Sequence, residues 1–235
     1  MMGRRLPDRR LSKQRAFDLA YAATTAAATV TGALGHRRAA GLTKPLPMLL
    51  LVAQAAAGAR ERDALDNAGL AGALAFSMAG DRLMLLEEFE TEPVAKDRYL
   101  RLGATLFAGA QLSYVATMWR AGARPSARQL LPRVGVLAES AAVLARHRPA
   151  LLPVLGTYGN TLATMSATAS AMSDPQPRLR IGGVTFLLSD LAIINRRHLV
   201  TDPRVRVAGE AWVLASYFAA QYLLIGGLAE RLRRR

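Results

Sequence analysis

Two aspartates stand inside apolar stretches of this sequence, where a carboxyl group is unusual. Asp81 lies in LAFSMAGDRLMLL, and Asp190 lies in GGVTFLLSDLAIIN. Burying an ionisable group in such a setting is costly, so each aspartate is a candidate functional residue. If the two carboxyl groups share one site, burial disfavours their ionised forms, and each negative charge disfavours the other. Such a pair supplies one acid and one base, which makes Asp81 and Asp190 the candidate catalytic residues.

The elements that must position these aspartates are apolar segments long enough to cross a membrane. About 20 residues cross roughly 30 Å of hydrocarbon. Eight candidate segments of this kind are 17–35, 43–59, 67–86, 101–119, 129–145, 150–172, 179–195 and 208–228. A soluble helical bundle is the alternative, but segments with almost no interior charge would leave it without polar helix faces. The sequence therefore predicts an all-α fold, a polytopic integral membrane bundle of eight transmembrane helices forming one domain over 1–235.

Basic residues indicate how the bundle is oriented. The net charge of +14 is also typical of nucleic-acid-binding proteins. Here, however, the arginines form short clusters between apolar stretches, which is the pattern of membrane loops. More basic residues fall on the side that the two termini share, so we expect the basic segments 1–16 and 229–235 in the cytoplasm and no nucleic-acid partner. The arginine- and alanine-rich composition is typical of a GC-rich bacterial genome, which favours a bacterial inner membrane.

The two aspartates are expected at a similar depth, in the outer half of the membrane. Their segments, 67–86 and 179–195, cross in the same direction when eight segments alternate. Two simpler interpretations stay open. Asp81 followed by Arg82 also fits the end of a helix at the membrane interface, and Asp190 also fits a polar contact between helices.

Further polar residues fall at depths compatible with a pocket around the carboxyl groups. The candidate substrate-binding residues are Lys44, Ser77, Tyr158, Asn160, Ser189, Tyr217 and Gln221. Taken singly, each has an ordinary structural explanation: a lysine that snorkels to the interface, tyrosines that pack or sit in an aromatic belt, and amides that hydrogen-bond between helices. Together they predict a binding pocket with a cation, Lys44, at its mouth.

The sequence predicts no metal and no other cofactor. It contains no cysteine, so it has no thiolate nucleophile and no thiolate ligand. The three histidines each adjoin an arginine, as loop residues do, and are not expected to bind zinc. The chain lacks a phosphate-cradling glycine loop and a GxSxG nucleophile elbow.

Five short motifs, in this order and spacing, resemble the YhhN-like lysoplasmalogenase family of eight-span membrane proteins. They are KPLPM at 44–48, FSMAGD at 76–81, YGNTLATM at 158–165, FLLSD at 186–190 and YFAAQ at 217–221. The resemblance covers nearly the whole chain. It implies hydrolysis of the vinyl ether bond of lysoplasmalogens to a fatty aldehyde and a glycerophospho-base, with Asp81 and Asp190 in the positions of the family's aspartates. Whether the source organism has vinyl ether lipids is not set by the sequence, so the true substrate stays open.

The residues suit this chemistry. A vinyl ether hydrolyses when an acid protonates its β-carbon, and water then captures the oxocarbenium ion. That reaction needs a protonated carboxyl group and a second carboxylate that stabilises the cation or activates the water. The implied partners are a lysophospholipid substrate, water and membrane lipids, whereas the headgroup, the oligomeric state and the role of each aspartate stay open. A transporter or lipid-binding protein that uses Asp81 and Asp190 as proton or cation sites is the alternative from another class, and the GD and SD pairs in the two halves favour it.

Overall fold

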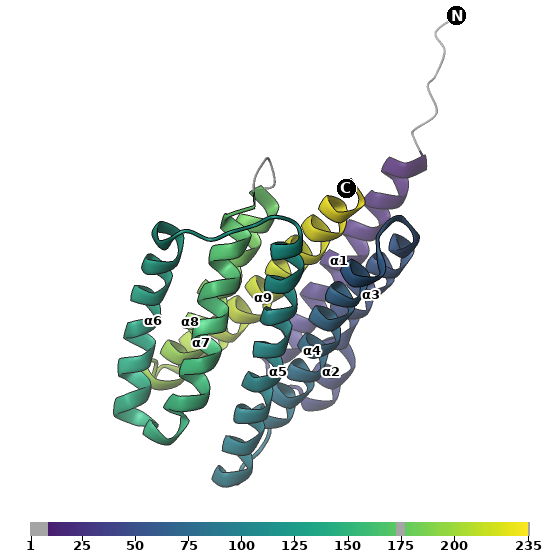
Figure 1. The fold of residues 1–235 in the computed structure, drawn as a ribbon. Helices are drawn as coiled ribbons and strands as arrows, with labels where there is room; N and C mark the ends of the chain where they lie inside the picture. The colour runs from purple at the N-terminus through teal and green to yellow at the C-terminus, as the bar shows by residue number, and fades with distance from the viewer. Residues whose placement is uncertain (1–8, 173–176, 235) are drawn as a thin grey trace, which may run out of the picture.

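The computed structural model describes residues 9–172 and 177–234, in which every regular element is helical (Figure 1). The α-helices are α1 (Arg9–Ala33), α2 (Arg37–Thr43), α3 (Pro45–Ala57), α4 (Ala64–Glu88), α5 (Pro93–Arg120), α6 (Ala127–His147), α7 (Leu152–Ser170), α8 (Pro177–Leu199) and α9 (Pro203–Arg233). Two short 3-10 turns, Ala59–Glu61 and Pro149–Leu151, precede α4 and α7.

Helices α2 and α3 form one nearly continuous rod. The residue between them, Lys44, has a helical backbone (φ −55°, ψ −36°). Pro45 then opens α3, a position where its missing N–H costs no helical hydrogen bond. With α2 and α3 counted together, each of the eight predicted apolar segments corresponds to one helical rod in the described chain.

The helix bounds differ from the predicted segments at both termini. Helix α1 begins at Arg9, so the predicted basic segment 1–16 is helical from residue 9 onward, and its first eight residues lie outside the described ranges. Helix α9 continues to Arg233, into the predicted tail 229–235, whose last residue also lies outside them.

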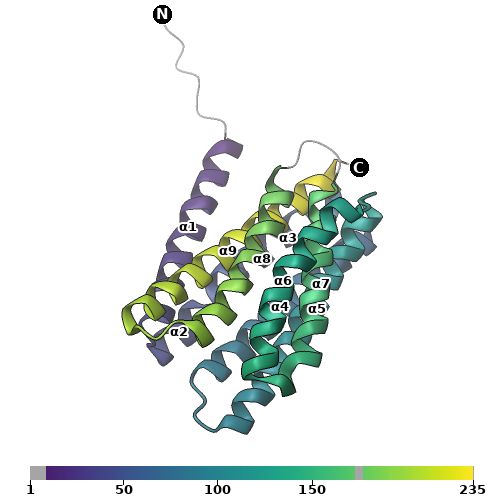
Figure 2. The same ribbon diagram turned by 90° about the vertical axis from the view of Figure 1, so that its left-hand side faces the viewer.

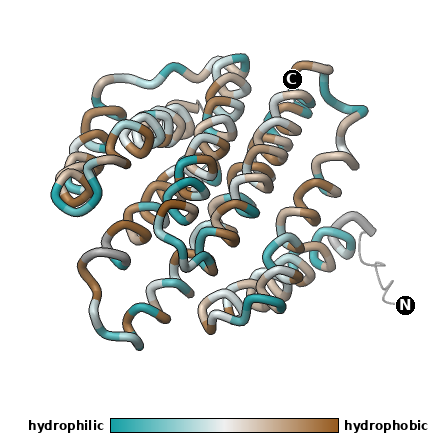
Figure 3. Tube along the Cα trace, turned by 90° about the horizontal axis from the view of Figure 1, so that it is seen from below, coloured by the Kyte–Doolittle hydropathy of each residue, from teal (hydrophilic) through white to brown (hydrophobic). Residues whose placement is uncertain are grey.

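Three of the rods are long and apolar enough to cross a membrane: Arg37–Ala57, Ala64–Glu88 and Pro203–Arg233. In the first two, 33% of the most apolar window is buried, so most of that window is half-buried or exposed. Figure 3 shows apolar residues on all the helices around the bundle. The other rods have between 19 and 28 residues. These rods are therefore long enough to cross a membrane, but they are not apolar enough by mean hydropathy or number of charged residues.

The longest helix, α9, is central. It packs against α1, α3, α4 and α8, and 61% of its most apolar window is buried. Helices α4 and α5 form a close pair, and α7 contacts α5, α6 and α8. Helices α1 and α6 lie at opposite edges of the bundle (Figure 1), and the turned view shows α1 beside α9 (Figure 2).

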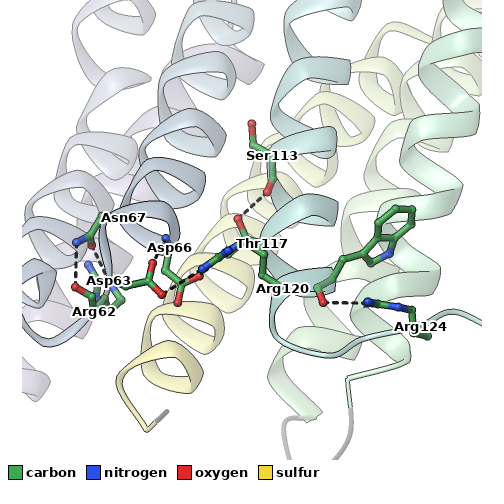
Figure 4. Close-up of polar contacts among 9 residues, drawn as sticks. Arg62, Asp63, Asp66, Asn67, Ser113, Thr117, Arg120 and Arg124 are labelled. Atoms are coloured by element: carbon green, nitrogen blue, oxygen red, sulfur yellow. Dashed lines mark hydrogen bonds and ion pairs between the residues drawn. The ribbon is translucent and has the colours of Figure 1, made fainter.

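The connections divide the bundle into two ends. The α4–α5, α6–α7 and α8–α9 loops lie at the end away from both termini (Figures 1 and 2). At the opposite end, polar residues tie the start of α4 to the end of α5 (Figure 4). Asp63 caps α4 by accepting a bond from the Asp66 amide at 2.7 Å, and the Arg120 guanidinium reaches both carboxylates at 3.1 and 3.2 Å. The end that carries the termini is thereby braced.

Candidate functional site

A cavity of about 620 Å³ lies between the helices and reaches the end of the bundle away from the termini. Its walls come from the rod of α2 and α3 and from α4, α5, α6, α7, α8 and α9. Asp81 of α4 and Asp190 of α8 both line this one cavity, although they are 109 positions apart in the chain. Helix α4 continues to Glu88, so Asp81 does not mark the end of a helix.

Tyrosine and glutamine side chains of α9 hold Asp81. The Tyr217 hydroxyl donates to the Asp81 Oδ2 at 2.8 Å. Gln221, one turn further along α9, donates from its amide nitrogen to the Tyr217 hydroxyl at 3.1 Å and to the Ser77 Oγ at 3.0 Å. Ser77 and Gln221 were predicted to bind substrate, but they do not line the cavity. Both are fully buried behind Tyr217.

Three phenylalanine rings fix the Tyr217 side chain. The ring centroids of Phe107, Phe186 and Phe218 lie 5.9, 5.6 and 5.2 Å from that of Tyr217, the first two in edge-to-face geometry. Such aromatic contacts restrict the ring beyond simple burial. The Tyr217 hydroxyl is therefore held in place toward Asp81.

Asp190 has a tyrosine partner from another helix. The Tyr158 hydroxyl of α7 is in hydrogen-bonding contact with the Asp190 Oδ2. One residue before Asp190, the buried Ser189 donates to the Val213 carbonyl of α9 at 2.9 Å and so ties α8 to α9. The exposed Asn160 also lines the cavity.

Charged side chains of both signs gather where the cavity reaches the end of the bundle. Lys44 lies there, but it is not a free cation, since its ammonium pairs with the Glu88 carboxylate at 2.8 Å. The other lining charged residues at this mouth are Glu87, Lys96, Arg148, Arg196, Arg206 and Glu210. Lys96 pairs with Glu87 at 3.8 Å, and Arg196 pairs with Glu210. Sequence reasoning missed these pairs because their members come from loop-proximal positions of different helices.

The two aspartates, which are half-buried, differ from the fully buried carboxylates of the described chain. Asp66, Glu87 and Glu210 each lie within 4 Å of an arginine or lysine nitrogen. Among the described residues, neither Asp81 nor Asp190 forms such an ion pair. Each aspartate instead has a tyrosine hydroxyl as its hydrogen-bonding partner. A carboxyl group without a neutralising cation is free to hold or release a proton, which is what acid–base chemistry needs.

A family model for the YhhN family matches residues 39–228 of the chain. The chain belongs to the YhhN family. Comparisons with curated proteins and with solved structures found no match. In this YhhN protein, both cavity aspartates and every predicted binding residue lie inside the matched region, whereas α1 lies wholly outside it.

Two polar residues of the YhhN fold that sequence reasoning missed lie one turn apart on α5. The Tyr114 hydroxyl donates to the Gln221 amide oxygen at 2.6 Å, and Gln111 contacts the Thr161 hydroxyl of α7. Both side chains are at most 1% exposed. Gln111 lies inside the apolar segment 101–119, and a buried amide needs hydrogen-bonding partners on other helices. Its position could therefore have indicated a polar contact between helices from the sequence alone.

Proposed function

We propose that this protein is an integral membrane hydrolase with eight transmembrane helices that cleaves the vinyl ether bond of lysoplasmalogen-like lysolipids. The observation that carries the proposal is the meeting of Asp81 and Asp190 in one cavity, each bonded to a tyrosine and neither paired with a cation in the described chain. Membership of the YhhN family supports it. The products are a fatty aldehyde and a glycerophospho-base.

The reaction requires one protonated carboxyl group and one carboxylate. The acid transfers its proton to the β-carbon of the vinyl ether, which creates an oxocarbenium ion. The carboxylate stabilises this cation and takes a proton from the attacking water, so that a hemiacetal forms. Return of that proton to the glycerol oxygen breaks the carbon–oxygen bond, while the hemiacetal hydroxyl returns a proton to the first carboxylate. One water is consumed, and both aspartates regain their starting states.

The shape and charge of the cavity suit a single-chain phospholipid. Its lining includes apolar side chains such as Leu137, Leu144 and Leu155, which suit an acyl chain. The mouth combines cations such as Lys44 and Arg196 with carboxylates. A headgroup that carries a phosphate and an ammonium group would find charges of opposite sign for both.

The decisive experiment measures aldehyde release by the purified protein in detergent. A vinyl ether lysolipid is the substrate, and the matched saturated alkyl ether lysolipid, which cannot be protonated in this way, is the control. We expect aldehyde from the first substrate only, and we expect Asp81→Asn and Asp190→Asn each to abolish most of the turnover. The double variant should cost little more than the worse single variant, because the two groups act as a unit.

A third aspartate offers a matched control. Asp18 of α1 accepts bonds from the Tyr222 hydroxyl and the Gln14 amide, both at 2.7 Å, but does not line the cavity. Asp18→Asn should therefore keep full activity. Absence of aldehyde with folded protein, or near-normal release by either cavity variant, would refute the mechanism. Gradient-driven lipid uptake into vesicles without any product would instead indicate a transporter that uses these aspartates.

A further inference from the structure

Arg206 is the one basic residue of the cavity lining that has no acidic partner among the described residues. The other four basic residues of the lining each lie within 4 Å of a carboxylate, in the pairs Lys44–Glu88, Lys96–Glu87, Arg148–Asp97 and Arg196–Glu210. The Arg206 side chain is exposed. Its guanidinium is therefore available to an anion that reaches the mouth of the cavity.

The neighbours of Arg206 on α9 explain why it is left without a partner. Residues four apart on a helix share a face, so Asp202 and Glu210 are the acids best placed to pair with it. Asp202 instead caps the start of α9, where its carboxylate accepts backbone amides, the shorter bond being 2.7 Å. The Glu210 carboxylate is paired with Arg196 of α8. Both acids are thus engaged with other groups.

A hydrogen bond between α8 and α9 sets the depth of Arg206 relative to Asp190. The Ser189 hydroxyl donates to the Val213 carbonyl at 2.9 Å, so the residue before Asp190 lies level with Val213. Helix α9 begins at the end of the bundle where the cavity has its mouth (Figure 1). Arg206 comes seven residues before Val213. It therefore lies about 10 Å of helix further toward the mouth.

This spacing suits the length of a lysophospholipid headgroup. The glycerol of such a lipid, when extended, puts the phosphorus roughly 6 Å from the vinyl ether oxygen. The long side chain of Arg206 bridges the remaining distance. A lipid whose vinyl ether lies beside Asp190 can therefore place its phosphate at Arg206.

Building on the proposed function, we infer that Arg206 binds the phosphate of the lysolipid, and that the protein for this reason selects phosphorylated lysolipids over neutral alkenylglycerols. A guanidinium suits a phosphate because it donates two parallel hydrogen bonds to a pair of oxygens. The headgroup then lies at the mouth, and the alkenyl chain lies inward among the apolar side chains. Arg206 touches no reacting atom. It binds the substrate and so positions the vinyl ether at the carboxyl groups.

Lys44, the cation predicted at the mouth, is less available to a phosphate than Arg206. Its side chain is 12% exposed, and its ammonium is already bonded to the Glu88 carboxylate at 2.8 Å. A phosphate at Lys44 would have to compete with this carboxylate for the same cation. Lys44 should therefore contribute less than Arg206 to phosphate binding.

Kinetics with two substrates test the role of Arg206. One substrate is the vinyl ether lysophospholipid, and the other is the matched alkenylglycerol, which has the same chain but no phosphate. Arg206→Gln should raise KM for the phospholipid roughly 5- to 10-fold, because an open mouth weakens a charged contact. It should leave KM for the alkenylglycerol unchanged. Arg206→Lys keeps the charge but loses the paired donors, so its KM for the phospholipid should lie between those of the parent and the Gln variant.

Arg204 offers a matched control. It is an exposed arginine of the same turn of α9, but it does not line the cavity. Arg204→Gln removes the same charge and should keep both KM values. Equal effects of Arg206→Gln and Arg204→Gln, or an equal change of KM for the two substrates in Arg206→Gln, would overturn the assignment.

Binding without turnover tests the assignment independently of the reaction. The ligands are the saturated alkyl ether lysophospholipid and the matched saturated alkylglycerol, which have no vinyl ether to cleave. The parent protein should bind the first more tightly and lose this preference as the salt concentration is raised, whereas Arg206→Gln should bind both about equally. A preference that salt does not reduce, or that Arg206→Gln retains, overturns the assignment. Inorganic phosphate alone should not raise the melting temperature, and protection by phosphate that Arg206→Gln abolishes would indicate a site for a soluble anion in place of a lipid.

The two proposals fail separately. If Arg206→Gln loses the preference in binding but no lysolipid releases an aldehyde, the assignment of Arg206 stands and the proposed reaction is wrong. If aldehyde is released but Arg206→Gln behaves as the parent does, the reaction stands and the assignment is wrong.

Discussion

Replacing Tyr217 by Phe removes one hydroxyl group and keeps the ring that fills the space. The ring retains its contacts with Phe107, Phe186 and Phe218, so we expect the variant to fold. What it loses is the 2.8 Å bond to Asp81. A hydrogen bond to a charged group contributes about 1.5–3 kcal/mol. If that bond acts fully in the transition state, kcat/KM falls roughly 10- to 150-fold.

The assay is aldehyde release from a vinyl ether lysolipid, followed together with the melting temperature of the detergent-solubilised protein. Tyr222→Phe is the matched control, because it removes a tyrosine hydroxyl that donates to Asp18 at 2.7 Å outside the cavity. We expect a large loss of activity in the first variant and nearly full activity in the second. Activity within twofold of the parent in Tyr217→Phe, or an equal loss in both variants, would refute the role given to this hydroxyl.

Four further predictions concern the mouth, the packing, the acid stability and the orientation. Lys44→Met should raise KM for phosphorylated lysolipids more than it lowers kcat, and unchanged kinetics would leave Lys44 as an interfacial anchor. Gly183→Ala should destabilise the protein by about 1–3 kcal/mol, because its Cβ would lie 3.2 Å from the Ser166 Cα. Gly156→Ala, inside α7 where the space is open, should keep or slightly raise the melting temperature, because alanine favours a helix. The bond from the Asp66 amide holds the pKa of Asp63 below its usual range. The Asp63 cap therefore stabilises the fold at pH values above the pKa of Asp63 in the unfolded chain, and this stabilisation is lost as the pH falls through its pKa in the folded protein. Asp63→Asn should accordingly flatten the decline of melting temperature in acid. A reporter inserted at 89–92 should be active only outside the cytoplasm, and one fused after residue 235 only inside it, whereas the opposite pattern would place the cavity mouth in the cytoplasm.

The apolar segments of the chain were enough to predict where the helices run. Each predicted segment coincides with a rod, because long apolar runs bounded by charged clusters leave few other choices for the backbone. Membrane crossing was harder to establish. Alanine-rich stretches such as 17–35 form good helices but contribute little to insertion, so helix formation and hydropathy give different answers there.

The candidate site was predictable in part. Asp81 and Asp190 were found because a carboxyl group in an apolar run is costly, and that cost is visible in one sequence. The face on which Gln221 and Ser77 lie was not visible, since it depends on how α9 is rotated against α4. Tyr114 was missed for a similar reason: a tyrosine in an apolar segment is usually a packing residue, and only its 2.6 Å bond to Gln221 separates it from the others.

The paired glycines of α8, Gly182 and Gly183, allow this helix to pack closely against α7 and α9. A Cβ at Gly182 would lie 3.0 Å from Leu223 of α9, and one at Gly183 would lie 2.9 Å from Ala169 of α7, so α8 is pinched between two helices near its beginning. Asp190 lies about two turns further along, toward the end of the bundle where charged pairs such as Arg196 with Glu210 join the helices. We therefore expect the helices to be held more firmly around these glycines than at the mouth of the cavity. We expect hydrogen exchange to be slower around these glycines than at the mouth of the cavity.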